Sequence, residues 1–154
     1  MSVSRRTLLR ATPAWLAAIH MVQANYPQAR RACEGLAPLA PLLIRSGCFA
    51  YVDSVTGRAS VGAEALRTTL NTAPTTGGAT SPEQRLWALT RLGEIEEHRG
   101  AFAPAEAAYR EALALDLSDV YLLAAYSDFL LDRGRAGEVL GLLKGRARAD
   151  VLLL

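Results

Sequence analysis

Glycines that end predicted helices recur at a nearly fixed spacing, and this recurrence constrains the fold more than any other feature of the sequence. Gly100 and Gly134 are 34 residues apart, and each follows one helical pattern and precedes another. Glycine readily adopts the left-handed conformation that follows a helix end. A period of this size is typical of stacked helical repeats. The sequence therefore predicts consecutive helical hairpins.

The residues around these glycines support helices. Ser81-Pro82-Glu83-Gln84 predicts a helix start, with Ser81 capping the free amides and Gln84 completing a capping box. Pro104 opens a second helix, and Ser118 with Asp119 begins a third. Hydrophobic residues make up 51% of the chain but aromatics only 6%, so Ala and Leu carry the apolar content and favour helix over sheet.

One repeat shows an ordered set of leucines, small residues and a tyrosine: Leu89, Leu92, Gly93, Gly100, Ala105, Tyr109 and Ala112. With this spacing the segment resembles the tetratricopeptide repeat family, although Glu96 replaces the usual aromatic and Leu117 the usual proline. A weaker copy follows one period later, with Ser127 at the helix crossing. Two divergent copies precede it and include Phe49, Ala50, Gly57, Gly62, Leu66, Leu16, Ala17, Ala29, Cys33 and Leu36.

The resemblance implies an all-α, right-handed solenoid of stacked antiparallel helix pairs, in which small residues allow close helix crossings. We expect a single domain over 1–154, with about four repeats and the start of a further helix. The repeats are expected at about 10–42, 43–76, 86–119 and 120–150, with a loop insertion at 76–85. The expected structural residues are Gly93, Ala105, Tyr109 and Ala112 at the helix crossing, and Gly100 and Gly134 in the turns. Asp150 resembles a helix cap followed only by Val151–Leu154, so we expect a chain truncated at its carboxyl end.

Motifs of catalysis are absent from the sequence. It contains no glycine-rich phosphate loop, no Gly-x-Ser-x-Gly elbow and no His-Glu-x-x-His motif. Glu94 and His98 share a predicted helix face, but two ligands do not make a metal site that needs three or four. We therefore expect no enzyme activity, no cofactor and no metal.

The two cysteines leave two interpretations open. Cys33 and Cys48 are either two buried thiols or, on adjacent helices of the inferred stack, a disulfide. A disulfide closing a loop of roughly 15 residues would contribute about 3 kcal/mol in the chain-entropy account, given an oxidising compartment.

The resemblance also implies a ligand groove, because the first helix of each repeat lines the concave side in this family. The residues expected there are Trp87, Thr90, Glu94, Glu97, His98, Tyr121, Ala124, Asp128, Asp132 and Tyr51. Aromatics beside carboxylates suit a protein segment with apolar anchors and Arg or Lys. For Trp87 and Tyr121 the alternative is packing against a neighbouring helix. Thr90 and Glu94 stand where the family's carboxylate clamp has Lys and Asn, which disfavours binding of a peptide carboxylate.

The expected function is a non-catalytic module that binds a peptide or protein segment. The alternative is a self-associating element that uses its exposed terminal repeat face. Residues 1–70 contain eight basic and three acidic residues (net +5), whereas residues 71–154 contain nine and twelve (net −3), an asymmetry that favours head-to-tail contact. Nucleic-acid binding is disfavoured because the groove candidates are acidic.

The first residues bear on the compartment. Ser4–Arg10, with Arg5 and Arg6, resembles a twin-arginine export signal, but Pro13, Trp15 and His20 interrupt the apolar region that should follow. No apolar stretch is long enough for a membrane span. A cytoplasmic location in a bacterium is therefore expected, with the periplasm as the alternative.

Overall fold

The computed structural model describes residues 15–37, 40–73, 80–115 and 117–144, and every regular element among them is a helix. A helical segment at 15–22 precedes α2 (Tyr26–Glu34), α3 (Leu42–Val55), α4 (Ala59–Thr72), α5 (Pro82–His98), α6 (Phe102–Leu113), α7 (Val120–Leu131) and α8 (Ala136–Leu143). The predicted all-α class is confirmed. None of the helices in these ranges is long and apolar enough to cross a membrane. Arg5, Arg6 and the Asp150–Leu154 end lie outside the described residues.

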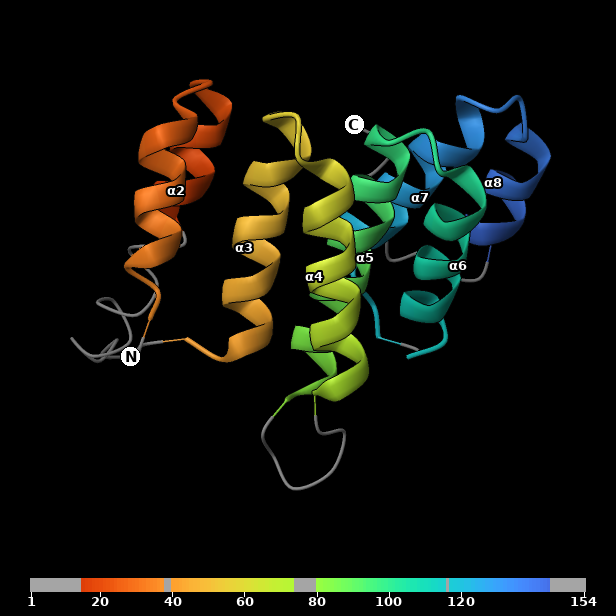
Figure 1. Cartoon of the computed structure of the whole chain (residues 1–154). Helices are drawn as coiled ribbons and strands as arrows, with labels where there is room; N and C mark the ends of the chain where they lie inside the picture. Colours follow the sequence, from red (N-terminus) through yellow and green to blue (C-terminus); the bar gives the residue numbers. More distant parts are fainter. Residues whose placement is uncertain (1–14, 38–39, 74–79, 116, 145–154) are drawn as a thin grey trace, which may run out of the picture.

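Consecutive helices pack side by side along the chain (Figure 1). The most extensive contacts join α3 to α4 and α5 to α6, and α7 packs on α8. Contacts between pairs join α2 to α3, both α3 and α4 to α5, and both α5 and α6 to α7. Each helix pair in the described ranges thus contacts the next pair along the chain.

The turn inside each pair has the same backbone form. Gly57, Gly100 and Gly134 have φ of 80°, 70° and 69°, and Ala24 has φ of 53° at the corresponding place in the first pair. The following amide donates to a carbonyl five residues earlier in every case: Asn25 to His20, Arg58 to Asp53, Ala101 to Glu96 and Arg135 to Leu130, at 2.8 to 3.0 Å. The first turn carries no glycine, so the sequence pattern does not mark it.

Close helix crossings explain the small residues. A Cβ on Gly93 would lie 2.6 Å from the Tyr109 ring, so α5 and α6 approach this closely only because residue 93 is glycine. Ala105, Tyr109 and Ala112 are fully buried beside it. In the preceding pair a Cβ on Gly62 would lie 2.8 Å from the Ala50 carbonyl oxygen.

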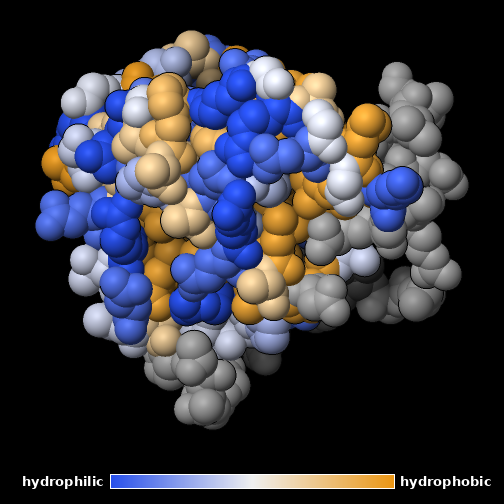
Figure 2. Space-filling model, turned by 90° about the vertical axis from the view of Figure 1, so that its right-hand side faces the viewer, coloured by the Kyte–Doolittle hydropathy of each residue, from blue (hydrophilic) through white to orange (hydrophobic). Residues whose placement is uncertain are grey.

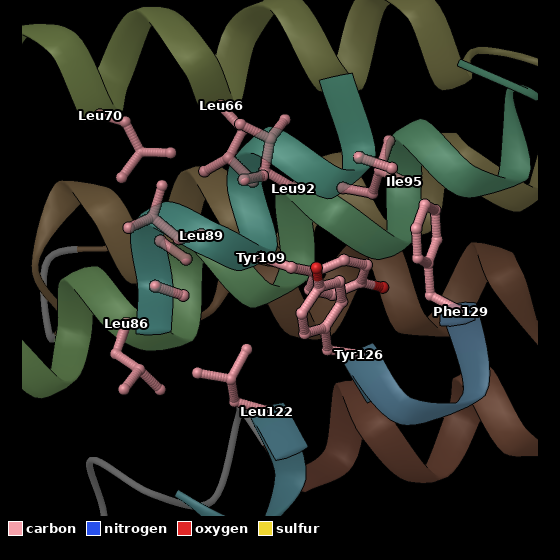
Figure 3. Close-up of a cluster of buried hydrophobic side chains, with 14 of the residues drawn as sticks. Leu66, Leu70, Leu86, Leu89, Leu92, Ile95, Tyr109, Leu122, Tyr126 and Phe129 are labelled. Atoms are coloured by element: carbon pink, nitrogen blue, oxygen red, sulfur yellow. The ribbon is translucent and has the colours of Figure 1, made fainter. Parts of the chain in front are cut away.

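Two apolar cores run through the described residues. The larger one joins side chains from α3 to α8. Figure 3 shows the part of it that is contributed by α4 to α7. At its centre Tyr109, Tyr126 and Phe129 bring their ring centroids within 5.4 to 6.0 Å of one another. The smaller core joins the first helix pair to α3 through Ala17, Ala29, Cys33 and Val52. The first pair is therefore held by a core of its own.

The structure also bears on two local expectations, the state of the cysteines and the start of the helix at Ser81. Of the two interpretations for the cysteines, the structure has the disulfide: Cys33 on α2 is bonded to Cys48 on α3, with their Cα atoms 5.7 Å apart. The predicted capping box is present, because Ser81 and Gln84 exchange side-chain-to-backbone hydrogen bonds. Since α5 begins at Pro82, the last four residues of the predicted insertion 76–85 belong to this helix.

Candidate functional site

A small apolar hollow lies where the first three helix pairs meet. It has a volume of about 90 Å³ and is lined by Ala17, Ala18, Met21, Leu36, Ile44, Gly47, Cys48, Tyr51, Val52, Trp87 and Arg91. Small-molecule sites usually have volumes of roughly 300–1,000 Å³. This hollow is therefore smaller than a usual small-molecule site and has room for about one apolar side chain.

Trp87 forms one wall of the hollow because α3 has a glycine beneath it. A Cβ on Gly47 would lie 2.5 Å from the Trp87 indole ring, so the ring packs directly on the α3 backbone. Trp87 is half-buried in this position. It therefore packs on the neighbouring helix, as one of the two interpretations expected, and it also lines a surface hollow.

Arg91 stands at the rim, surrounded by aromatic rings from three helices. Its guanidinium carbon lies 4.5 Å from the Tyr51 ring centroid, 5.0 Å from that of Tyr121 and 5.8 Å from that of Trp87. One of its nitrogens also donates to Glu94 at 2.8 Å and to the Tyr121 hydroxyl at 3.0 Å. These contacts join α3, α5 and α7 on one side of the molecule.

The surroundings of Arg91 and Tyr121 raise the pKa of both side chains. Burial opposes the charge of Arg91, but Glu94, Tyr121 and Tyr51 outweigh burial and raise the pKa of Arg91 above its ordinary value. Burial, together with the hydrogen bond that its hydroxyl donates to Glu94, raises the pKa of Tyr121. Arg91 therefore stays cationic and Tyr121 stays neutral near neutral pH.

The structure thus brings four expected groove residues together: Tyr51, Trp87, Glu94 and Tyr121. Thr90 does not join them, and its expected exposure was wrong. It is 1% exposed, and its hydroxyl donates to the Leu86 carbonyl at 2.9 Å. The helical register turns residue 90 toward the core, where this local bond satisfies its hydroxyl.

Glu97 and His98 already have partners within the chain. The Glu97 carboxylate accepts from the Tyr109 hydroxyl at 3.3 Å and lies 3.5 Å from Arg133. His98 lies 3.3 Å from the Ser54 hydroxyl of α3. These residues connect neighbouring helix pairs and leave fewer polar atoms for a ligand.

The candidates at α7 include two exposed carboxylates. Asp128 and Asp132 are exposed, and Ala124 is half-buried on the same helix. Within the described ranges neither aspartate side chain makes an ion pair or hydrogen bond. The same ranges hold no group of three His, Cys, Asp or Glu residues that could bind a metal.

Sequence reasoning missed the buried charges. Glu96, which replaces the usual aromatic residue of the family, is fully buried, where it accepts from Arg67 of α4 and, at 2.6 Å, from Arg99. Its register was a usable signal, since it follows Leu92 and Gly93 of the apolar face by four and three residues. Arg91 follows Trp87 by four residues, but no local pattern indicated that rings from other helices would surround it.

Comparisons with family models, curated proteins and solved structures find no match to this chain.

Proposed function

We propose that the chain is a tetratricopeptide-like, right-handed solenoid that binds a protein segment and has no catalytic role. The four turns of the same backbone form support the repeat architecture, as do the small residues at the crossings. The contact of each pair with the next supports stacking. The observation that carries the function is the cluster of rings from α3, α5 and α7 around Arg91, beside an apolar hollow.

The chemistry of this surface defines the proposed ligand. The hollow takes one apolar side chain, and Tyr51, Trp87 and Tyr121 offer rigid aromatic area beside it. Asp128 and Asp132 extend the surface with unpaired negative charge, which attracts Arg or Lys. The ligand is thus a segment with one large apolar anchor and nearby basic residues.

Selection from a random peptide library tests this proposal. We expect the selected peptides to combine a large apolar residue with Arg or Lys. Ala18 is exposed and lines the hollow, so Ala18→Phe fills the hollow without changing the core. This variant should bind the selected peptides about tenfold more weakly or worse in fluorescence anisotropy.

The matched control is Ala65→Phe, an equal enlargement at an exposed position of α4 outside the hollow. It should bind as the wild type does. Peptides that bind Ala18→Phe and the wild type equally would refute the hollow as the ligand site.

Self-association is the second candidate, favoured by exposed apolar residues at the α8 end. Leu140 is 71% exposed and Leu131 is 51% exposed. The face at this end is largely hydrophilic, with apolar residues between the polar ones (Figure 2). Light-scattering mass over a range of concentrations tests this candidate, and a monomer throughout would remove it.

The disulfide bears on the proposed compartment. Disulfides persist in oxidising compartments and are rare where glutathione and thioredoxin keep thiols reduced. The Cys33–Cys48 bond therefore favours the periplasm over the cytoplasm.

A further inference from the structure

The disulfide lies at the junction that forms the hollow. Cys33 belongs to α2 of the first helix pair, and Cys48 belongs to α3 of the second. Ala17, Ala18, Met21 and Leu36 line the hollow from the first pair, and Cys48 lines it from the second. One cysteine is thus both a wall of the hollow and half of the bond across the junction.

The noncovalent contacts at this junction include a small apolar core, an ion pair and the stacking of Arg30 on the Phe49 ring. The first pair shares only a small core with α3, separate from the core that joins α3 to α8. An ion pair between Arg30 and Asp53, at 2.8 Å, adds to it, but the Arg30 side chain is 40% exposed. By contrast, fully buried Tyr109 and Leu122 join the later pairs within the larger core. The disulfide therefore adds a covalent bond to a junction whose apolar core is small and separate from the larger one.

The two cysteine residues differ in their exposure to solvent. Cys33 is fully buried, whereas Cys48 is partly exposed and lines the hollow. A thiolate must reach a sulfur atom to break a disulfide. Of the two cysteines, the one that a thiolate reaches more readily is therefore Cys48, from the side of the hollow.

We propose that the Cys33–Cys48 disulfide is a redox latch on the hollow, an inference that rests on the proposed function. The reductant is a dithiol. One of its thiolates attacks Cys48 Sγ, the bond between Cys48 and Cys33 breaks, and Cys33 leaves as a thiolate that takes up a proton. The second thiol then displaces Cys48, which leaves as a thiolate and is protonated, and the reductant becomes a cyclic disulfide. Two electrons and two protons pass to the protein.

Reduction frees the first helix pair from α3 and removes one side of the hollow. Because linkage is reciprocal, a ligand that prefers the intact hollow also stabilises the disulfide. A bound segment in addition covers Cys48 and slows its attack by the dithiol. The oxidised chain is therefore the binding form.

Hydrogen exchange of the whole chain, with and without dithiothreitol, tests the latch without any ligand. We expect amides of α2 to exchange at least about tenfold faster after reduction, while amides of α5 to α8 keep their rates. Unchanged α2 exchange would overturn the proposal. Equal acceleration in every helix would also overturn it, because the bond would then support the whole fold and not one junction.

The fluorescence of Trp87, which lines the hollow, gives a second measurement. The chain has two tryptophans, so Trp15→Phe leaves Trp87 as the single emitter. Its emission maximum should shift to longer wavelength on reduction, and an unshifted maximum contradicts the loss of the hollow. The double variant Cys33→Ala, Cys48→Ala is the control. Its exchange rates and emission maximum should match those of the reduced protein and should not change when dithiothreitol is added.

Peptides from the library selection separate the two proposals. Oxidised protein should bind them at least about tenfold more tightly than reduced protein, and the peptides should slow reduction. Equal affinity of both forms, with binding still lost in Ala18→Phe, overturns the latch and leaves the proposed function standing. A different result would be faster α2 exchange on reduction, but no selected peptide that binds Ala18→Phe more weakly than the wild type. That result would refute the proposed function and the regulation that rests on it.

Discussion

Glu96 is buried, although glutamate side chains are usually exposed to solvent. Its carboxylate is fully buried, but Arg67 and Arg99 approach it from two sides with side chains that are 43% and 28% exposed. A buried charge is tolerated when it is paired and hydrogen-bonded. The arginines keep partial contact with water, so leaving them without the carboxylate costs little free energy. Removing an arginine costs more, because the buried carboxylate has no water to replace it.

This asymmetry gives a prediction for two variants. Arg67→Met leaves Glu96 buried with one cation and should lower the free energy of unfolding by about 1–3 kcal/mol. Glu96→Gln should cost less, about 1 kcal/mol, because both arginines can turn to solvent. Urea denaturation with an unchanged m-value measures both.

Arg58→Met is the control for losing a surface arginine. Arg58 is 55% exposed and lies 3.8 Å from Asp53, so its loss should cost less than about 0.5 kcal/mol. A larger effect of Glu96→Gln than of Arg67→Met would contradict the account given for Glu96.

At the scale of elements, the distance between paired helices depends on a few positions without a side chain. Gly93 lets α5 approach α6 until its backbone meets the Tyr109 ring. Gly141 on α8 has open space around the place where a Cβ would lie. Two glycines within helices therefore have opposite roles.

We expect opposite outcomes when each is replaced by alanine. Gly93→Ala should destabilise the chain by about 1–3 kcal/mol, because the added methyl overlaps a fully buried ring. Gly141→Ala should be neutral or stabilising by up to about 1 kcal/mol through helix propensity. Thermal and urea unfolding of both variants measure this difference, and equal effects would refute the packing argument.

Over the whole molecule, each junction between helix pairs has an arginine–carboxylate contact. Arg30 meets Asp53, Arg67 meets Glu96, and Arg135 meets Glu106 through two hydrogen bonds of 2.8 Å. The hydrogen bonds from Arg135 are the main reason that the pKa of Glu106 falls from 4.5 to about 2. The last junction should therefore depend on acidity.

The direction of this dependence follows from linkage. Since folding lowers the Glu106 pKa, its contribution to stability is complete above pH 4.5 and is lost as the pH falls through about 2. Compared with Glu106→Gln, the wild type should lose about 1 kcal/mol more over this range, after allowance for solvent screening. Urea unfolding at several pH values measures the difference, and parallel curves for the two proteins would contradict it.

The sequence was sufficient for features with a local cause. The helices, the capping box at Ser81 and the glycine turns follow from residue types and their spacing along one chain segment. The turn at Ala24 was missed because no glycine marks it in the sequence. The burial of Thr90 and Glu96, and the aromatic surroundings of Arg91, depend on helices more than 25 residues away in sequence or on exact register. Single-sequence patterns contain little of that information.

The separation of the turns along the chain has a consequence for how such an array can vary. Successive left-handed turn residues are 33, 43 and 34 positions apart, yet the pairs around them contact one another in the same order. Side-chain packing between pairs, and not the length of the connecting segment, therefore sets their mutual placement. Connections of other lengths can join the same pairs and leave the proposed binding surface unaltered.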